Sequence, residues 1–191
     1  MQSILGTQET GAAGSAGEDM IRVGFDGDDR LHLHSDNDST FSIATSPVYR
    51  DPSSWYHVVI ACDTTQSTDT DRIKFYVNGD QITNFDTTNW PSQNLETAFN
   101  YAHTHRVGAS YGDTTETYDG YLAEFYWIDG AQLTPSSFAE TDTTTNQWKP
   151  IEYDGSSVST YIPGDRTSTA VSYTHLRAHE TREDRVRRQK L

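Results

Sequence analysis

The stretch DRIKFYVNG, residues 71–79, alternates apolar and polar side chains and then closes with an Asn-Gly pair. A period of two is the pattern of a β-strand with one buried face and one face in solvent. Asn-Gly is the strongest short signal for a hairpin, because both residues accept positive φ angles. These nine residues therefore predict a strand that ends in a tight turn and continues as an antiparallel partner.

The same period recurs in earlier segments of the chain. Apolar side chains occupy every second position in residues 21–25, 31–34 and 41–44. Residues 55–62 and 121–128 are apolar on both faces and are predicted to be central strands. Short strands separated by clusters of Gly, Asn, Asp and Thr predict an all-β fold, an antiparallel β-sandwich of the jelly-roll kind.

At most one short helix is expected, near residues 135–140. Thr134 can cap it, and Pro135 suits its first position. A chain of 191 residues fits one domain of this class, which we place at residues 1–170. Cys62 is the only cysteine, so the chain forms no internal disulfide.

Charge excludes one class of partner. Residues 1–170 hold 8 basic and 25 acidic residues, a net charge of −17. Such a surface repels phosphate backbones, so nucleic-acid binding is not expected. The longest apolar run, residues 58–62, is far too short to cross a bilayer, and residues 1–5 do not resemble a signal peptide. Membrane insertion is therefore not expected either.

The last 21 residues, 171–191, differ from the rest and hold six basic and three acidic residues. Their apolar side chains do not form a stripe at helical spacing. Residues 171–181, VSYTHLRAHET, also resemble a translated sequencing-adapter read-through, which occurs in metagenomic sequences. This tail is predicted to be non-native or disordered; the alternative is a basic arm that binds the acidic body or a polyanion.

Three segments together resemble one known family. They are YRDPSSWYHVV (residues 49–59), the opening stretch at 71–79, and YDGYLAEFYWIDG (residues 118–130), which continues to WKP at 148–150. In order and spacing they are similar to the concanavalin A-like (laminin G-like, pentraxin-like) domains of marine phage structural proteins. The resemblance covers roughly residues 20–153.

The resemblance implies a concanavalin A-like sandwich that belongs to a phage particle. Two departures from the family pattern suggest a fragment. No aromatic-rich strand precedes Ile4 and Leu5, and the closing strand is reduced to residues 158–162. A domain truncated in this way is expected to have an unpaired sheet edge and a tendency to form oligomers.

Enzymatic activity is not expected. Glycoside hydrolysis needs two carboxylates that flank one bond, and similar hydrolases carry them as Glu-x-Asp-x-x-Glu on one strand. This chain offers Glu124, with Asp129 at the following turn, so the motif is absent. Glu124 is interpreted as a structural carboxylate, and no catalytic residue is assigned.

Aromatic side chains in loops are the candidates for sugar binding, because sugars stack on aromatic faces beside polar groups. The candidates are Trp90, Tyr111, Tyr118 and, more weakly, Tyr101. Packing onto the sandwich is the alternative for each of them.

Calcium is the cofactor to consider, because similar domains hold it at a loop rim and it prefers oxygen ligands. The chosen candidates are Asp26, Asp28 and Asp29, and other acidic clusters lie at residues 36–38 and at Asp69 and Asp71. Turn formation is the alternative role for these residues. The pairs His32 with His34 and His103 with His105 are expected to face solvent rather than to bind a metal.

The sequence thus leads to three hypotheses. The first is a non-catalytic carbohydrate-binding or adhesion module of a virion protein, of tail-fibre or decoration type, that contacts host-surface glycans. The second is a structural module that binds other virion proteins or forms a homo-oligomer. The third, and least favoured, is a glycoside hydrolase-like enzyme.

Overall fold

The computed structural model describes residues 2–8, 20–36, 41–100, 104–110, 117–155 and 168–177. The strands are β1 (Gln2–Gln8), β2 (Met20–Phe25), β3 (Arg30–Asp36), β4 (Phe41–Val48), β5 (Trp55–Asp63), β6 (Ile73–Val77), β7 (Asp80–Gln81), β8 (Phe85–Asn89), β9 (Thr104–Val107), β10 (Phe125–Asp129), β11 (Ala139–Thr141), β12 (Trp148–Pro150) and β13 (Ser168–Arg177). The helical turns are α1 (Asp69–Arg72), η1 (Ala98–Asn100) and η2 (Pro135–Ser137).

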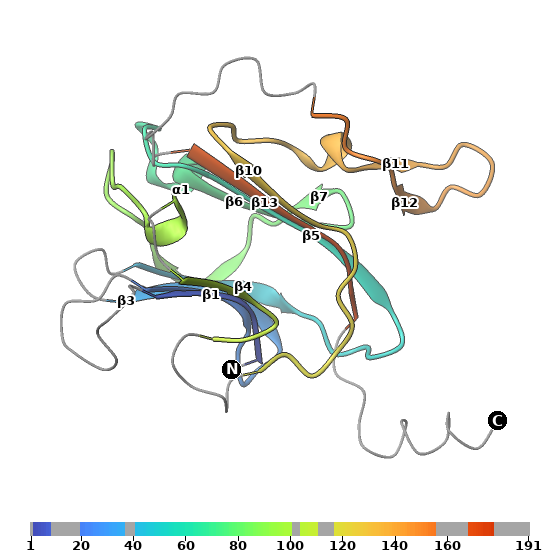
Figure 1. Cartoon of the computed structure of the whole chain (residues 1–191), viewed down its shortest axis with the longest axis horizontal. Helices are drawn as coiled ribbons and strands as arrows, with labels where there is room; N and C mark the ends of the chain where they lie inside the picture. Colours follow the sequence, from blue (N-terminus) through green and yellow to red (C-terminus); the bar gives the residue numbers. More distant parts are fainter. Residues whose placement is uncertain are drawn as a thin grey trace.

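Two antiparallel sheets lie face to face, as Figure 1 shows, and confirm the predicted β-sandwich. One sheet has six strands in the order β8-β4-β3-β2-β1-β9, and the other has five in the order β10-β13-β5-β6-β7. The strands β11 and β12 form a separate two-stranded sheet. β1 pairs with β2 on one side and β9 on the other, so Ile4 and Leu5 lie inside the six-stranded sheet rather than at an edge.

The core lies between the inner faces of the two sheets, where the predicted alternation places it. Its fully buried members include Ile21, Val23, Leu31, Leu33, Phe41, Ile43, Val58, Ile60, Ile73 and Phe75. Removing these side chains from water supplies the main driving force for folding, about 1.5–3 kcal/mol for each large apolar residue. Cys62 lies in the same core, and burial raises the pKa of its thiol to about 12.

β5 is a central strand that is buried on both faces, as predicted. Its neighbours are β13 and β6. Val59 points away from the main core and packs with Leu133 and Phe138, which lie on either side of η2. The segment around η2 therefore covers the outer face of the five-stranded sheet, and this explains why β5 carries apolar residues on both sides.

The second segment predicted to be a central strand is different. Residues 121–128 do not form one continuous strand: β10 spans Phe125–Asp129 and is an edge strand, and all its residues are half-buried. Its side chains are apolar on both faces because Phe125 and Trp127 pack against the main core, whereas Tyr126 and Ile128 pack against the cluster around η2 on the outer face. The prediction of a central strand here was wrong.

The chain does not leave the fold at Val171, where the sequence predicts that the tail begins. β13 extends to Arg177 and pairs with β5 on one side and β10 on the other. The helical-stripe criterion could not detect it, because a strand needs only backbone pairing and β-favouring residues such as Val171 and Tyr173. Residues 178–191 lie outside the described part of the chain, as do residues 158–162, where the reduced closing strand was expected.

The predicted helical turn is present as η2, with Pro135 at its first position, but the side chain of Thr134 does not make the predicted capping hydrogen bond. Pro135 begins a single 3₁₀ turn, and β11 follows directly after Phe138. The sequence did not predict α1 or η1, which are one turn each and connect strands.

The predicted Asn-Gly hairpin is confirmed and has an unexpected partner. Asn78 and Gly79 have φ angles of 52° and 91° and connect β6 to β7. The indole ring of Trp148, from β12, packs on Gly79 and donates a hydrogen bond of 2.9 Å from Nε1 to Nδ1 of buried His57. A Cβ at position 79 would lie 3.1 Å from this ring, so another residue would require the ring to shift by a few tenths of an ångström and would also be strained by the positive φ.

We expect Gly79→Ala to destabilise the fold more than Gly155→Ala. Both glycines have positive φ, so alanine costs about 1–2 kcal/mol of backbone strain at either position. Only at position 79 must the Trp148 ring also move, because nothing lies within 4 Å of a Cβ at position 155. Urea unfolding of both variants measures the difference, and equal losses of stability would show that the Trp148 contact is not tight.

Candidate functional site

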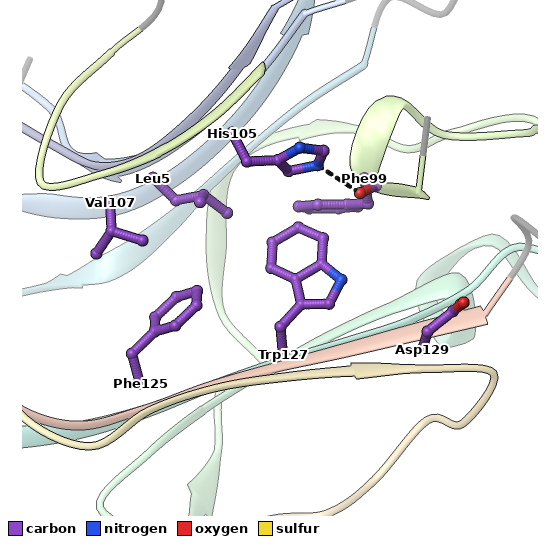
Figure 2. A pocket seen from close by; sticks show the side chains of 7 residues that line it. All are labelled: Leu5, Phe99, His105, Val107, Phe125, Trp127 and Asp129. Atoms are coloured by element: carbon purple, nitrogen blue, oxygen red, sulfur yellow. Dashed lines mark hydrogen bonds between the residues drawn. The ribbon is translucent and has the colours of Figure 1, made fainter. Parts of the chain in front are cut away.

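A cavity of about 450 Å³ opens on the side of the sandwich where β9 and β10 form the sheet edges. Figure 2 shows the described side chains that line it. They are Leu5, Phe99, His105, Val107, Phe125, Trp127 and Asp129. The volume is within the range of small-molecule sites in proteins, about 300–1,000 Å³.

Strand alternation brings these residues together from distant parts of the sequence. On β10, Phe125, Trp127 and Asp129 occupy every second position and so project to the same side. On the opposite sheet, Val107 of β9 is paired with Leu5 of β1. The cavity is therefore walled by the inner faces of both sheets.

Trp127 is the central side chain of the cavity. Its ring centroid lies 5.6 Å from that of Phe99, 5.2 Å from His105 and 6.4 Å from Phe125. The first two contacts are edge-to-face, the favourable arrangement for aromatic rings. Because neighbours on several sides hold the half-buried indole, its orientation is set before any ligand arrives.

Two polar groups accompany the aromatic rings. His105 donates a hydrogen bond of 2.8 Å from Nε2 to the backbone carbonyl oxygen of Phe99, since a carbonyl oxygen can only accept. This bond ties β9 to η1 and fixes the imidazole ring above Trp127 (Figure 2). Asp129 ends β10 and brings a carboxylate to the cavity.

The residues predicted from sequence to bind sugar lie elsewhere. Trp90 is half-buried and packs on Phe85, with ring centroids 5.1 Å apart, at the margin of the core. Tyr118 is also half-buried against the core, and burial raises the pKa of its phenol. Neither residue lines the cavity, and Tyr101 and Tyr111 lie outside the described residues.

The three aspartates predicted to bind calcium interact with arginines. Asp26 and Asp28 contact the guanidinium of Arg30, at 2.8 Å and 2.9 Å, and Asp29 contacts Arg50 at 2.9 Å. Burial acts to raise the pKa of Asp26, but hydrogen bonds from the backbone and side chain of Arg30 outweigh it and hold this pKa below its ordinary value. Calcium binding at this turn stays a prediction.

The other metal candidates are also dispersed. Asp69 and Asp71 lie on α1, where Asp71 contacts Lys74 at 3.4 Å. His32 and His34 lie on the outer face of the six-stranded sheet, with ring centroids 5.6 Å apart. Within the part of the chain that the structure describes, no three His, Cys, Asp or Glu side chains are grouped to hold a metal ion. Residues 37, 38 and 103 lie outside that part.

Glu124 is not on a strand, in contrast to its interpretation from sequence. It is exposed, directly precedes β10 and has a φ of 53°, in the left-handed region. A non-glycine residue in this region is uncommon. The chain bends at Glu124 as it enters β10, three positions before Trp127.

Comparison with known protein families matches residues 3–139 to the concanavalin A-like lectin/glucanases superfamily. The match covers more than half of the chain, and the chain belongs to this superfamily. Comparison with curated protein sequences and with solved structures gives no match. Among the described residues, no helix has the length and apolar character needed to span a membrane.

Most of the cavity could not be predicted from the sequence. Asp129 was expected only as a turn residue, His105 only as an unfavoured metal ligand, and Phe125 and Trp127 only as members of a central strand. The available signal was the alternation Phe-x-Trp-x-Asp in residues 125–129, which places two rings and one carboxylate on one face. It was hidden because the intervening residues, Tyr126 and Ile128, are also apolar.

His32 gives the fold a dependence on pH. Burial lowers the pKa of His32 to about 4, and the charge of His34 adds to the shift. Between pH 6.5 and 4 the unfolded chain binds a proton at this position that the folded chain rejects. The stability contributed by neutral His32 is therefore present above pH 6.5 and is lost as the pH falls towards 4.

We expect His32→Gln to flatten the dependence of unfolding free energy on pH in this window. Urea unfolding of the original chain and the variant at pH 7, 6, 5 and 4.5 measures it. The original chain should lose more stability than the variant as the pH falls. Parallel curves would show that the His32 proton does not contribute.

Proposed function

We propose that the protein is a non-catalytic carbohydrate-binding module that serves adhesion, and that a sugar ring stacks on Trp127 in the cavity between β9 and β10. The observation that carries this proposal is the cavity itself. It combines aromatic faces held in fixed orientation with His105 and Asp129 beside them, which is the chemistry that sugar recognition uses. The membership of the chain in a superfamily named for lectins and glucanases supports it.

The non-catalytic part of the proposal rests on the carboxylates. Hydrolysis of a glycosidic bond uses two carboxyl groups about 5–10 Å apart. Of the described residues that line the cavity, one is a carboxylate, Asp129. Glu124 lies on the bend before β10 and does not line the cavity.

The setting that we propose is a phage particle, with the module on a tail-fibre or decoration protein that contacts host-surface glycans. Its support is the sequence resemblance of residues 49–59, 71–79 and 118–150 to domains of phage structural proteins. The net charge of −17 over residues 1–170 agrees with a surface that does not bind the packaged nucleic acid.

A structural assembly module is the second candidate. The observation in its favour is the open side of the sandwich, where β9 and β10 are the sheet edges among the described strands. Val107 of β9 is 50% exposed there. Edge strands with exposed apolar side chains can pair with another chain. Self-association of the protein without any dependence on glycans would favour this role.

We expect Trp127→Ala to weaken glycan binding more than tenfold without unfolding the chain. Loss of a central aromatic contact costs about 2 kcal/mol or more, which weakens binding more than tenfold. A glycan array followed by calorimetry on the best ligand measures the effect, and circular dichroism checks the fold.

Trp55→Ala is the matched control for this experiment. Trp55 is 44% exposed and does not line the cavity, so its loss should leave the affinity unchanged. Trp90→Ala should lower the melting temperature, because its ring packs on Phe85, and should leave the affinity of the folded protein intact. Binding that survives Trp127→Ala but is lost in Trp55→Ala would move the site away from the cavity.

A further inference from the structure

One end of the cavity is lined, among the described residues, by apolar side chains. Figure 2 shows Leu5, Val107 and Phe125 together on one side of the Trp127 indole. Leu5 and Val107 are paired directly across β1 and β9, and the ring centroid of Phe125 lies 6.4 Å from that of Trp127. The side chains of Leu, Val and Phe contain neither a hydrogen-bond donor nor an acceptor. We call these three residues the apolar end.

The polar side chains of the described lining lie at the opposite end. Strand geometry fixes this order, because residues two positions apart share a face. On β10, Phe125 and Asp129 lie two residues from Trp127 in opposite directions, each about 6.6 Å along the strand. On β9, Val107 lies two residues beyond His105, whose ring centroid is 5.2 Å from that of Trp127. A ligand stacked on Trp127 therefore meets an apolar end and a polar end.

Resting on the proposed function, we infer that the sugar bound on Trp127 is a 6-deoxyhexose whose methyl group lies at the apolar end. Most carbons of a hexose ring carry hydroxyl groups, which need hydrogen bonds from water or protein. Leu5, Val107 and Phe125 offer none from their side chains. The methyl group of a 6-deoxyhexose is the one corner of the sugar that needs no hydrogen bond, so it is the corner that fits these residues.

Comparison with an ordinary hexose explains the selection. The hexose carries a hydroxymethyl group at the same corner, and its oxygen would lose water at the apolar end without gaining a side-chain partner. A polar group buried without a hydrogen bond is unfavourable, whereas a buried methyl group is favourable. Leu5 is 1% exposed and Val107 is 50% exposed, so the apolar end still has apolar surface for a methyl group to cover.

The test compares sugars that differ by one oxygen atom. NMR titration of the full chain measures dissociation constants for two pairs of methyl glycosides, L-fucose with L-galactose and L-rhamnose with L-mannose. In at least one pair the 6-deoxy member should bind about tenfold more tightly, a difference of about 1.4 kcal/mol. All four sugars are neutral and each pair is measured in one buffer. The charges of His105 and Asp129 are therefore the same for both members and cancel in the ratio.

Val107→Thr tests whether the apolar end is responsible. Threonine has nearly the shape of valine but adds a hydroxyl group that can bond to the hydroxymethyl oxygen. The preference for the 6-deoxy member should therefore fall from about tenfold to about threefold or less. The variant should fold, because position 107 is half exposed and threonine favours strands. Val48→Thr makes the same change on β4, outside the cavity and 45% exposed, and should keep the preference.

Each result decides the inference. A preference for the 6-deoxy members that Val107→Thr lowers and Val48→Thr keeps supports it. Equal or weaker binding of the 6-deoxy members, no binding of either 6-deoxy sugar, or an equal effect of the two Thr variants overturns it. If a glycan without a 6-deoxyhexose binds in a Trp127-dependent manner and neither 6-deoxy sugar binds, the inference fails while the proposed function stands. Failure of every glycan to bind overturns both.

Discussion

Backbone hydrogen bonds between β13 and its two neighbours hold the five-stranded sheet together. β5 lies on one side of β13 with its core side chains, and β10 lies on the other with the cavity residues. Every buried N–H and C=O group of these strands needs a partner, and β13 supplies partners in both directions. The pairing of β10 with this strand positions the backbone of Phe125, Trp127 and Asp129. The cavity therefore depends on residues near the end of the chain that do not line it.

The sequence was sufficient to predict the layers of the fold but not the position of each strand within a sheet. Alternation in residues 73–77 identified a half-buried strand, and Asn78-Gly79 identified its turn, because both signals depend on local geometry. Whether a strand is central or at an edge depends on what lies beside it. An apolar residue such as Tyr126 looks the same in either place, so β10 was assigned wrongly. β13 was missed because its segment lacks helical periodicity and resembles a translated adapter, and neither observation tests for a strand.

Two tryptophans show why the site was harder to predict than the fold. Trp90 follows a strand, in a polar stretch typical of a binding loop, yet it packs on Phe85. Trp127 lies in an apolar stretch typical of a core, yet it lines a cavity. The ring of Trp127 is surrounded by residues more than 20 positions away in sequence, Phe99 and His105. The acidic turn at residues 26–29 gave a similar result, since guanidinium groups of Arg30 and Arg50 contact the carboxylates that oxygen-seeking cations would also use.

The single cysteine has a consequence of its own. The Cys62 thiol is sealed between the sheets, and its high pKa keeps it in the protonated, unreactive form. A thiol reagent can modify it only when β5 separates from the opposite sheet. The rate of that modification would record how often the sandwich opens, with and without a ligand at its side. Because Cys62 lies on β5, which pairs with both β13 and β6, the modification rate reports transient opening at the centre of the five-stranded sheet.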